Sequence, residues 1–221
     1  MDVATTRTAG SRTRLLTQDG IVDALLALAR ETPRAEVSIR MLASALGVTA
    51  AAIYRHFRDK DELHRAAVDR LYGEALSRVD RSEPSWRLRL ARYSDALAET
   101  FLEAPAIGQL SPLVDGRGIG ELASLDFIFE ALEQAGLSGQ RLIDAYGAYA
   151  GHTLAFAAGM ALELSRESAP GSSVPWIGML DAESLAPFPR LVRLRGDLLE
   201  MDTLVVYRAG VQAILDSIEA G

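Results

Sequence analysis

A short segment from Ser38 to Leu63 constrains the fold of this 221-residue chain more than any other feature. It places the small residue Ala43 four positions before Gly47 and ten before Ile53. This spacing predicts two helices joined by a tight turn, because glycine accepts positive φ at the turn and Ile53 packs the second helix onto the first. The remaining core positions follow at helical spacing: Leu42, Leu46, Val48 and Phe57. Such a unit presents a short helix to the major groove of DNA.

Composition narrows the class of protein. Half of the residues (49%) are hydrophobic, so a large core can form. The absence of cysteine excludes disulfides, thiolate nucleophiles and zinc-finger sites, and fits a reducing cytoplasm. Residues 1–14 are polar and do not resemble a signal peptide, so we expect a cytoplasmic protein. Residues 145–162 lack charge but are rich in Ala and Gly, which favours a buried helix over a membrane span.

Charge is distributed unevenly along the chain. The net charge is −7, yet residues 1–60 hold nine basic against six acidic residues, and residues 61–221 hold fourteen against twenty-four. The basic end contains the predicted helix-turn-helix. An acidic body with a basic end would orient the molecule on a polyanion such as DNA.

The N-terminal part predicts a three-helix domain followed by a connecting helix. A loose basic arm at residues 1–16 carries Arg7, Arg12 and Arg14. Thr17 is the expected N-cap of a helix to about Ala29, and Pro33 follows its end. The next helices are expected over Ser38–Leu46, Thr49–His56 and Lys60–Val79, the last starting with an Asp59–Glu62 capping box. Residues 17–80 therefore form the predicted DNA-binding domain.

Beyond Arg81–Ser85 the pattern is helical again, without alternating strands. We expect helices over Trp86–Leu102, Gly120–Ala135, Gly139–Ser165 and Leu198–Glu219, with loops at Gly116–Gly118 and Ser168–Pro189. The run Gly116–Gly120 looks like a phosphate loop, but no strand precedes it, so we interpret it as a flexible connection. The sequence thus predicts an all-α protein whose second domain, residues 85–221, is larger than the first.

With this predicted order of helices, the chain resembles the TetR family of bacterial regulators. The resemblance is strongest in Tyr54-x-His56-Phe57 and Lys60 after Gly47-Val48. The later part resembles the tetracycline-repressor type of C-terminal domain at Phe129–Leu137, Gly151–Leu154 and Gly210–Leu215. The resemblance implies a homodimer whose effector, bound in the C-terminal domain, changes the spacing of the two DNA-binding domains. Residues 100–118 contain no His to hold a drug-chelated metal, so we expect neither metal nor cofactor.

Roles within the helix-turn-helix follow from side-chain chemistry and this resemblance. Ala50, Ala51 and Ala52 can contact a thymine methyl but offer no hydrogen bonds, which leaves base discrimination to Arg40 and Arg55. The resemblance places Arg40 near the end of the second helix. It also assigns phosphate contacts to Thr49, Tyr54, His56 and Lys60. Alternatives remain open: Tyr54 as a packing residue, His56 as a neutral helix cap and Arg55 as a solvated surface residue.

The C-terminal domain offers a dimer face and a set of candidate effector contacts. Gly147, Gly151 and Gly159 interrupt a helix, which close approach of another helix would explain. With Leu204, Tyr207, Val211, Leu215 and Ile218 of the last helix they predict a four-helix bundle across a two-fold axis, or the same packing inside one subunit. Candidate effector-binding residues are Phe101, Gln109, Phe127, Tyr149, His152, Phe156, Trp176 and Met179. They suit a mostly apolar or aromatic small molecule, although each is also an ordinary core residue type.

These patterns predict an effector-responsive DNA-binding regulator, most simply a repressor on a palindromic operator. We expect no enzyme, because the three His residues and the absent Cys form no catalytic or metal-ligand spacing. Two alternatives stay open: a transcription activator of the same fold, and a small-molecule-binding protein with vestigial DNA binding.

Overall fold

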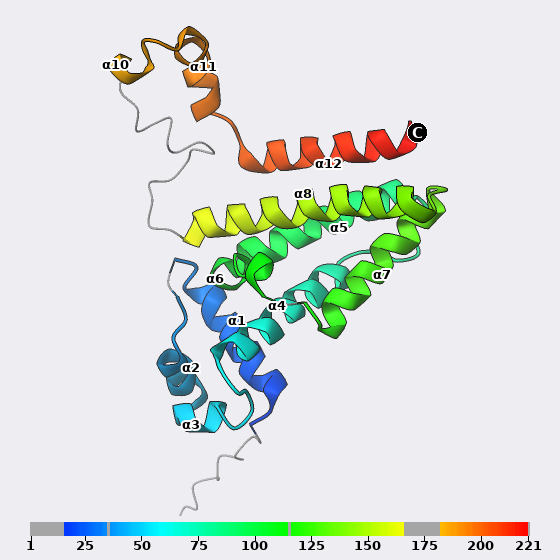
Figure 1. Cartoon of the computed structure of the whole chain (residues 1–221). Helices are drawn as coiled ribbons and strands as arrows, with labels where there is room; N and C mark the ends of the chain where they lie inside the picture. Colours follow the sequence, from blue (N-terminus) through cyan, green and yellow to red (C-terminus); the bar gives the residue numbers. More distant parts are fainter. Residues whose placement is uncertain (1–15, 35, 115, 166–181, 221) are drawn as a thin grey trace, which may run out of the picture.

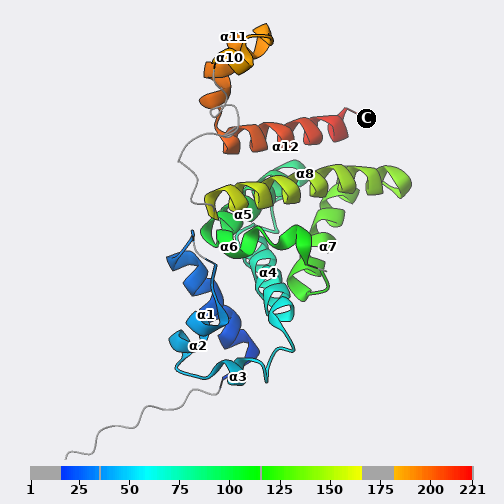
Figure 2. The same ribbon diagram turned by 60° about the vertical axis from the view of Figure 1, so that its left-hand side comes forward.

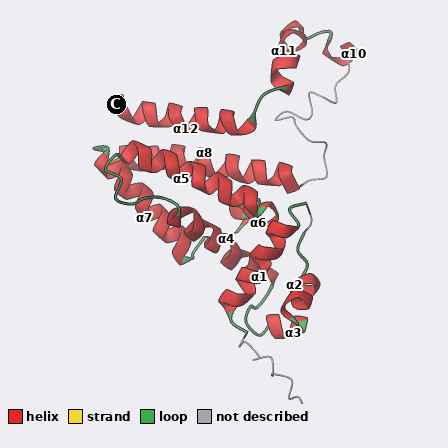
Figure 3. Cartoon of the chain, turned by 180° about the vertical axis from the view of Figure 1, so that it is seen from behind, coloured by secondary structure: helices red, strands yellow, loops and turns green. Residues whose placement is uncertain are grey.

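The computed structural model describes residues 16–34, 36–114, 116–165 and 182–220. Every regular element within these ranges is helical, so the predicted all-α class is confirmed for them (Figure 3). Helices α1–α3 lie together at one end of the molecule, α4 leads away from them, and α5, α7, α8 and α12 form the body (Figures 1 and 2). The predicted basic arm lies, except for Leu16, outside the described residues.

The three N-terminal helices begin at the predicted caps. They are α1 (Gln18–Glu31), α2 (Ile39–Leu46) and α3 (Ala50–Ile53). The side-chain oxygens of Thr17, Ser38 and Thr49 accept hydrogen bonds from backbone N–H groups in the first turns, at 3.1–3.3 Å. Helix α3 ends at Ile53 rather than His56, because the His56 N–H donates to the Ile53 carbonyl and tightens the chain into a turn.

Helix α4 (Lys60–Ser77) connects the two ends of the molecule. Asp59 caps it, accepting from the Glu62 N–H at 2.7 Å. Only half of the predicted capping box forms, because the Glu62 carboxylate accepts from the Arg58 N–H at 2.6 Å instead of from Asp59. The helix ends at Ser77, two residues before the predicted Val79.

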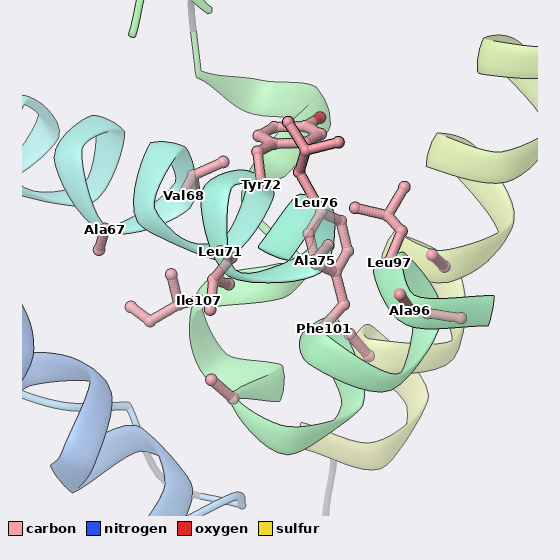
Figure 4. Packing of buried hydrophobic residues seen from close by; sticks show 14 of the residues in the cluster. Ala67, Val68, Leu71, Tyr72, Ala75, Leu76, Ala96, Leu97, Phe101 and Ile107 are labelled. Atoms are coloured by element: carbon pink, nitrogen blue, oxygen red, sulfur yellow. The ribbon is translucent and has the colours of Figure 1, made fainter. Parts of the chain in front are cut away.

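A close-packed core joins α4 to α5 (Trp86–Glu103) and to the short α6 (Pro105–Gly108). Figure 4 shows Leu71, Leu97 and Ile107 within this core. The rings of Tyr72 and Phe101 meet edge-on at 5.8 Å, and the Tyr72 hydroxyl is hydrogen-bonded to Ser111 at 2.7 Å in the 3-10 helix η1 (Ser111–Leu113). Sequence analysis predicted neither α6 nor η1, both too short to show a periodic pattern.

The backbone at the start of helix α7 (Ile119–Gln134) lies close against α4. The Asp69 carboxylate on α4 accepts from the Glu121 N–H at 2.9 Å, so a residue of one helix caps the N-terminus of another. A side chain at Gly120 would lie 2.9 Å from the Gly73 nitrogen and closer still to the Asp69 carbonyl, and one at Gly118 would overlap the Asp69 carboxylate. Gly116 and Gly118 lie in the connection between helices that the sequence predicts, whereas Gly120 lies against the backbone of α4, and this close approach requires a glycine.

Helices α8 (Gly139–Ser165) and α12 (Thr203–Glu219) lie side by side over α5 (Figures 1 and 3). The Tyr207 hydroxyl donates to the Ser94 carbonyl at 2.7 Å, and Arg208 pairs with Asp95 at 2.8 Å. The predicted bounds of α8 are confirmed. The apolar residues of α12 that were assigned to a dimer bundle face the interior of this subunit: Tyr207, Val211, Leu215 and Ile218 are buried.

The segment before α12 differs from the prediction. The expected helix over Leu198–Glu219 is two helices, α11 (Pro189–Leu199) and α12, because the Asp202 carboxylate caps a new helix at Thr203. Helices α11 and α10 (Ala182–Leu185) occupy part of the predicted loop Ser168–Pro189 and its C-terminal flank. Among the residues that the structure describes, no helix is long and apolar enough to cross a membrane.

Candidate nucleic-acid interface

The turn between α2 and α3 has the geometry that the sequence predicts. Gly47 adopts φ 65°, the left-handed conformation that a residue with a side chain rarely takes. An added Cβ there would meet nothing within 4 Å, so conformation and not space requires the glycine. The Val48 N–H donates to the Ala43 carbonyl at 3.0 Å and closes the end of α2. Behind the turn, Leu42, Ile53 and Phe57 are buried against α1 and α4.

The opposite side of α2 and α3 is open to solvent. Arg40, Thr49, Ala50, Ala51, Tyr54 and Arg55 are exposed, whereas His56 and Lys60 are half-buried. Arg40 is the second residue of α2, because Ser38 caps that helix; it lies at the N-terminal end and not near the C-terminal end. Ala52 is buried, so only two of the three alanines can face a ligand.

The two predicted base-reading arginines have no ion-pair partner among the residues that the structure describes. Within the described ranges, neither Arg40 nor Arg55 has a carboxylate within 4 Å or a hydrogen bond to another residue. Other cations near this surface are already paired: Arg58 with Glu62 at 3.4 Å, and Lys60 with Glu36. The Lys60 ammonium lowers the pKa of the Glu36 carboxyl, first through their hydrogen bond and then through its charge. Two guanidinium groups without a partner among the described residues therefore lie on the exposed side of α2 and α3.

One contact that holds this surface in place was not predicted. The Gln18 amide in the first turn of α1 donates to the His56 carbonyl at 2.6 Å, and so fixes the turn that follows α3. Two ion pairs from Arg70 on α4, to Asp19 and Asp23 on α1, hold the two helices together at 2.6 Å each. Nothing in the sequence pattern indicates these partners, which are 38 to 51 positions apart.

The candidate effector-binding residues fall in different parts of the body. Phe101, Phe127 and Tyr149 are fully buried, and the Tyr149 hydroxyl donates to the Leu90 carbonyl at 2.6 Å. Gln109, His152 and Phe156 are half-buried. Trp176 and Met179 lie outside the described residues. Phe101 packs on Tyr72 and Phe127 on Tyr93, so the set does not gather around one point.

His152 lies on α8 and forms a hydrogen bond with α12. Its Nε2 is hydrogen-bonded to the Tyr207 carbonyl at 3.0 Å, and its ring stacks on that of Tyr207 with centroids 5.6 Å apart. A side chain at Gly210 would overlap the His152 ring, so that glycine makes room for it. The bonded ring accounts for His152 without a ligand.

A cleft of about 570 Å³ lies where α4 meets the start of α7. Its walls carry three arginines and three carboxylates: Arg58, Arg65, Arg117, Glu62, Asp69 and Glu121. Burial and the neighbouring Asp69 charge raise the pKa of Glu121. Because three basic and three acidic side chains line it, the cleft favours neither anions nor cations, and we interpret it as part of the junction between α4 and α7.

Comparison with known proteins finds a family match in the N-terminal part of the chain. Residues 21–67 match the family model for bacterial regulatory proteins of the tetR family. The chain is 35% identical over 127 residues to an HTH-type transcriptional regulator of Saccharopolyspora erythraea, which covers 57% of this chain and 53% of that protein. The chain thus spans about half the length of the curated relatives it matches.

Two solved structures share the fold over nearly the whole chain. The Streptomyces coelicolor TetR family protein ActR, in complex with (S)-DNPA, superposes with a TM-score of 0.73 at 24% identity, over 94% of this chain and 99% of that one. BioQ of Mycobacterium smegmatis with its double-stranded DNA operator gives 0.64 at 21% identity, over 93% and 99%. At these identities the likeness establishes the fold.

Proposed function

Since the chain belongs to the TetR family of bacterial regulatory proteins by its helix-turn-helix domain, we propose that it is an effector-responsive transcription regulator. It binds a palindromic operator in the cytoplasm as a homodimer and acts as a repressor that a small molecule releases. The observation that carries this proposal is the exposed side of α2 and α3, where Arg40 and Arg55 have no ion-pair partner within the described residues. The operator complex of BioQ, a protein of the same fold, supports a double-stranded DNA partner.

Two classes of contact follow from the exposed side chains. Arg40 and Arg55 read bases, because a guanidinium fork matches the O6 and N7 acceptors of guanine. Thr49, Tyr54, His56 and Lys60 bind phosphates and fix the position of α3 along the duplex. Ala50 and Ala51 allow the backbone of α3 to come close to the base edges and contact a thymine methyl.

The outer face of α8 supports a homodimer. Gly147 and Gly151 are exposed, Gly159 is half-buried, and an added Cβ at any of the three would meet no described residue within 4 Å. A glycine inside a helix costs up to about 1 kcal/mol relative to alanine, and no contact within the described part of the subunit explains that cost. The α8 of a second copy packing against these positions would explain it, with α12 completing a four-helix bundle.

The effector is a small molecule of mostly apolar or aromatic character that binds the part of the chain beyond α4. The (S)-DNPA complex of ActR, a protein of the same fold, supports such a ligand. A displaced α7 would move α4 with it, because the Asp69 cap and the backbone contact at Gly120 join them. Helix α4 would then change the position of the DNA-binding domain.

The test is selection of bound duplexes from a random DNA pool at near-physiological salt, followed by anisotropy titration of the enriched sequence. We expect a palindrome with half-sites about one helical turn or more apart. Arg40→Ala should reduce the preference for the selected over a scrambled duplex by about 1–3 kcal/mol, and Lys60→Ala should weaken both equally.

Equal losses on both duplexes for Arg40→Ala would refute its role in base reading. No enrichment by a folded dimer, with tight binding of a small molecule, would support the alternative of vestigial DNA binding. A reporter gene under the selected site then separates repression from activation.

A further inference from the structure

One predicted phosphate contact is occupied by the protein itself. Lys60, the first residue of α4, forms an ion pair with Glu36 in the segment between α1 and α2. The side chain of Lys60 is 36% exposed and that of Glu36 is 77% exposed, so Glu36 is the more exposed partner of the pair. Arg40 and Arg55 have no such partner among the described residues.

The charged groups around this pair keep it ionised. The pKa of Glu36 is below its ordinary value, so its carboxylate is charged at neutral pH. His64, one turn after Lys60, is half-buried, and its pKa is lowered first by burial and then by the Lys60 charge. His64 is therefore neutral at neutral pH, and Glu36 is the carboxylate that pairs with the Lys60 ammonium.

We propose that Glu36 acts as an intramolecular competitor of DNA phosphate for Lys60, and so sets the affinity of the chain for all duplexes. This inference rests on the proposed function. A carboxylate and a phosphate are both anionic acceptors for one ammonium group. When Lys60 turns to a phosphate, Glu36 loses its partner and its charge lies near the DNA backbone. DNA binding therefore includes the cost of breaking the Lys60–Glu36 pair.

The effect of Glu36 is independent of base sequence. Every base pair carries the same phosphates, so the cost falls equally on operator and non-operator DNA. Salt weakens an exposed ion pair, so the cost shrinks as ionic strength rises. Glu36 thus lowers the non-specific binding that the basic N-terminal domain would otherwise have, without altering which bases are preferred.

The experiment measures the dissociation constants of five proteins for the selected and a scrambled duplex by anisotropy, at low and near-physiological salt. Four of them are wild type, Glu36→Gln, Lys60→Ala and the double variant of Glu36 and Lys60, and the fifth is a control. Glu74→Gln is the matched control, since it removes the same charge from the same domain but breaks a pair with Arg30 on α1. Circular dichroism confirms that all variants fold.

We expect Glu36→Gln to tighten binding of both duplexes by about 1.5- to 5-fold at low salt, the range of an exposed ion pair. This gain in affinity should exceed that of Glu74→Gln and should shrink at higher salt. In a protein that also carries Lys60→Ala, the gain from Glu36→Gln should fall to the level of Glu74→Gln. A gain no greater than that of Glu74→Gln, or one that persists unchanged without Lys60, overturns the inference alone. Failure of the wild-type chain to bind any duplex overturns the proposed function and this inference together.

Discussion

Substituting Gly120 by alanine tests whether backbone contact holds α7 against α4. The new Cβ would lie 2.9 Å from the Gly73 nitrogen, against at least 3.4 Å for an ordinary contact, and closer still to the Asp69 carbonyl. Both atoms belong to backbone, so no rotamer change relieves the overlap and the helices must separate. Overpacking of this kind costs about 1–3 kcal/mol, and the helix preference of alanine returns up to about 1 kcal/mol. The still closer contact with the Asp69 carbonyl places the overpacking cost at the upper end of this range, so we expect a net loss of about 2 kcal/mol in the free energy of unfolding.

Thermal unfolding followed by circular dichroism measures this loss. At about 2–4 °C per kcal/mol for a chain of this size, Gly120→Ala should lower Tm by roughly 4–8 °C. Gly73→Ala is the matched control at the same junction, because its Cβ would lie 3.9 Å from Gly120, an ordinary contact. Its Tm should equal or exceed that of wild type. A Gly120→Ala protein as stable as wild type would refute the argument that this close approach fixes the two helices.

Three further predictions concern a carboxyl, a hydroxyl and the outer face of α8. Burial and the Asp69 charge raise the pKa of Glu121 above its ordinary value of 4.5, so the folded state favours the protonated form and loses stability as pH rises through the raised pKa. Glu121→Gln should therefore raise Tm at pH 7, and the gain should vanish below about pH 4, where both states are protonated. Tyr149→Phe removes the buried hydrogen bond to the Leu90 carbonyl and should cost about 1 kcal/mol in chemical denaturation. Gly151→Arg should convert the dimer to a monomer in sedimentation velocity with helix content unchanged, because an added Cβ meets nothing within 4 Å in the subunit.

The controls for these three changes come from exposed positions. Glu133→Gln, on the same helix as Glu121, is the control for the first change. Because Glu133 is exposed, its effect on Tm should differ less between pH 7 and pH 4 than the effect of Glu121→Gln. Tyr54→Phe should leave stability unchanged, because Tyr54 is 45% exposed. A Gly151→Arg protein that stays dimeric would place the dimer interface elsewhere.

Local sequence signals determined the N-terminal domain of this protein. The caps Thr17, Ser38 and Thr49, and the left-handed turn at Gly47, act on atoms within a few residues along the chain, so the sequence pattern contains their causes. The long α8 was predicted to the residue for the same reason, since its helical pattern extends over 27 residues. The break before α12 was missed because apolar residues continue across it and only the Asp202 cap marks the start of the new helix.

Tertiary structure alone decided which charges are free and which helices touch. The Lys60–Glu36 pair joins residues 24 positions apart, and Asp69 caps a helix 52 positions away. No periodicity encodes such partners, because they depend on how separate helices pack and not on the order of residues within one. The sequence therefore predicted a surface able to face DNA. The fold decided that Arg40 and Arg55 have no ion-pair partner within the described ranges while Lys60 is held by a carboxylate, since only packing brings Glu36 to its side.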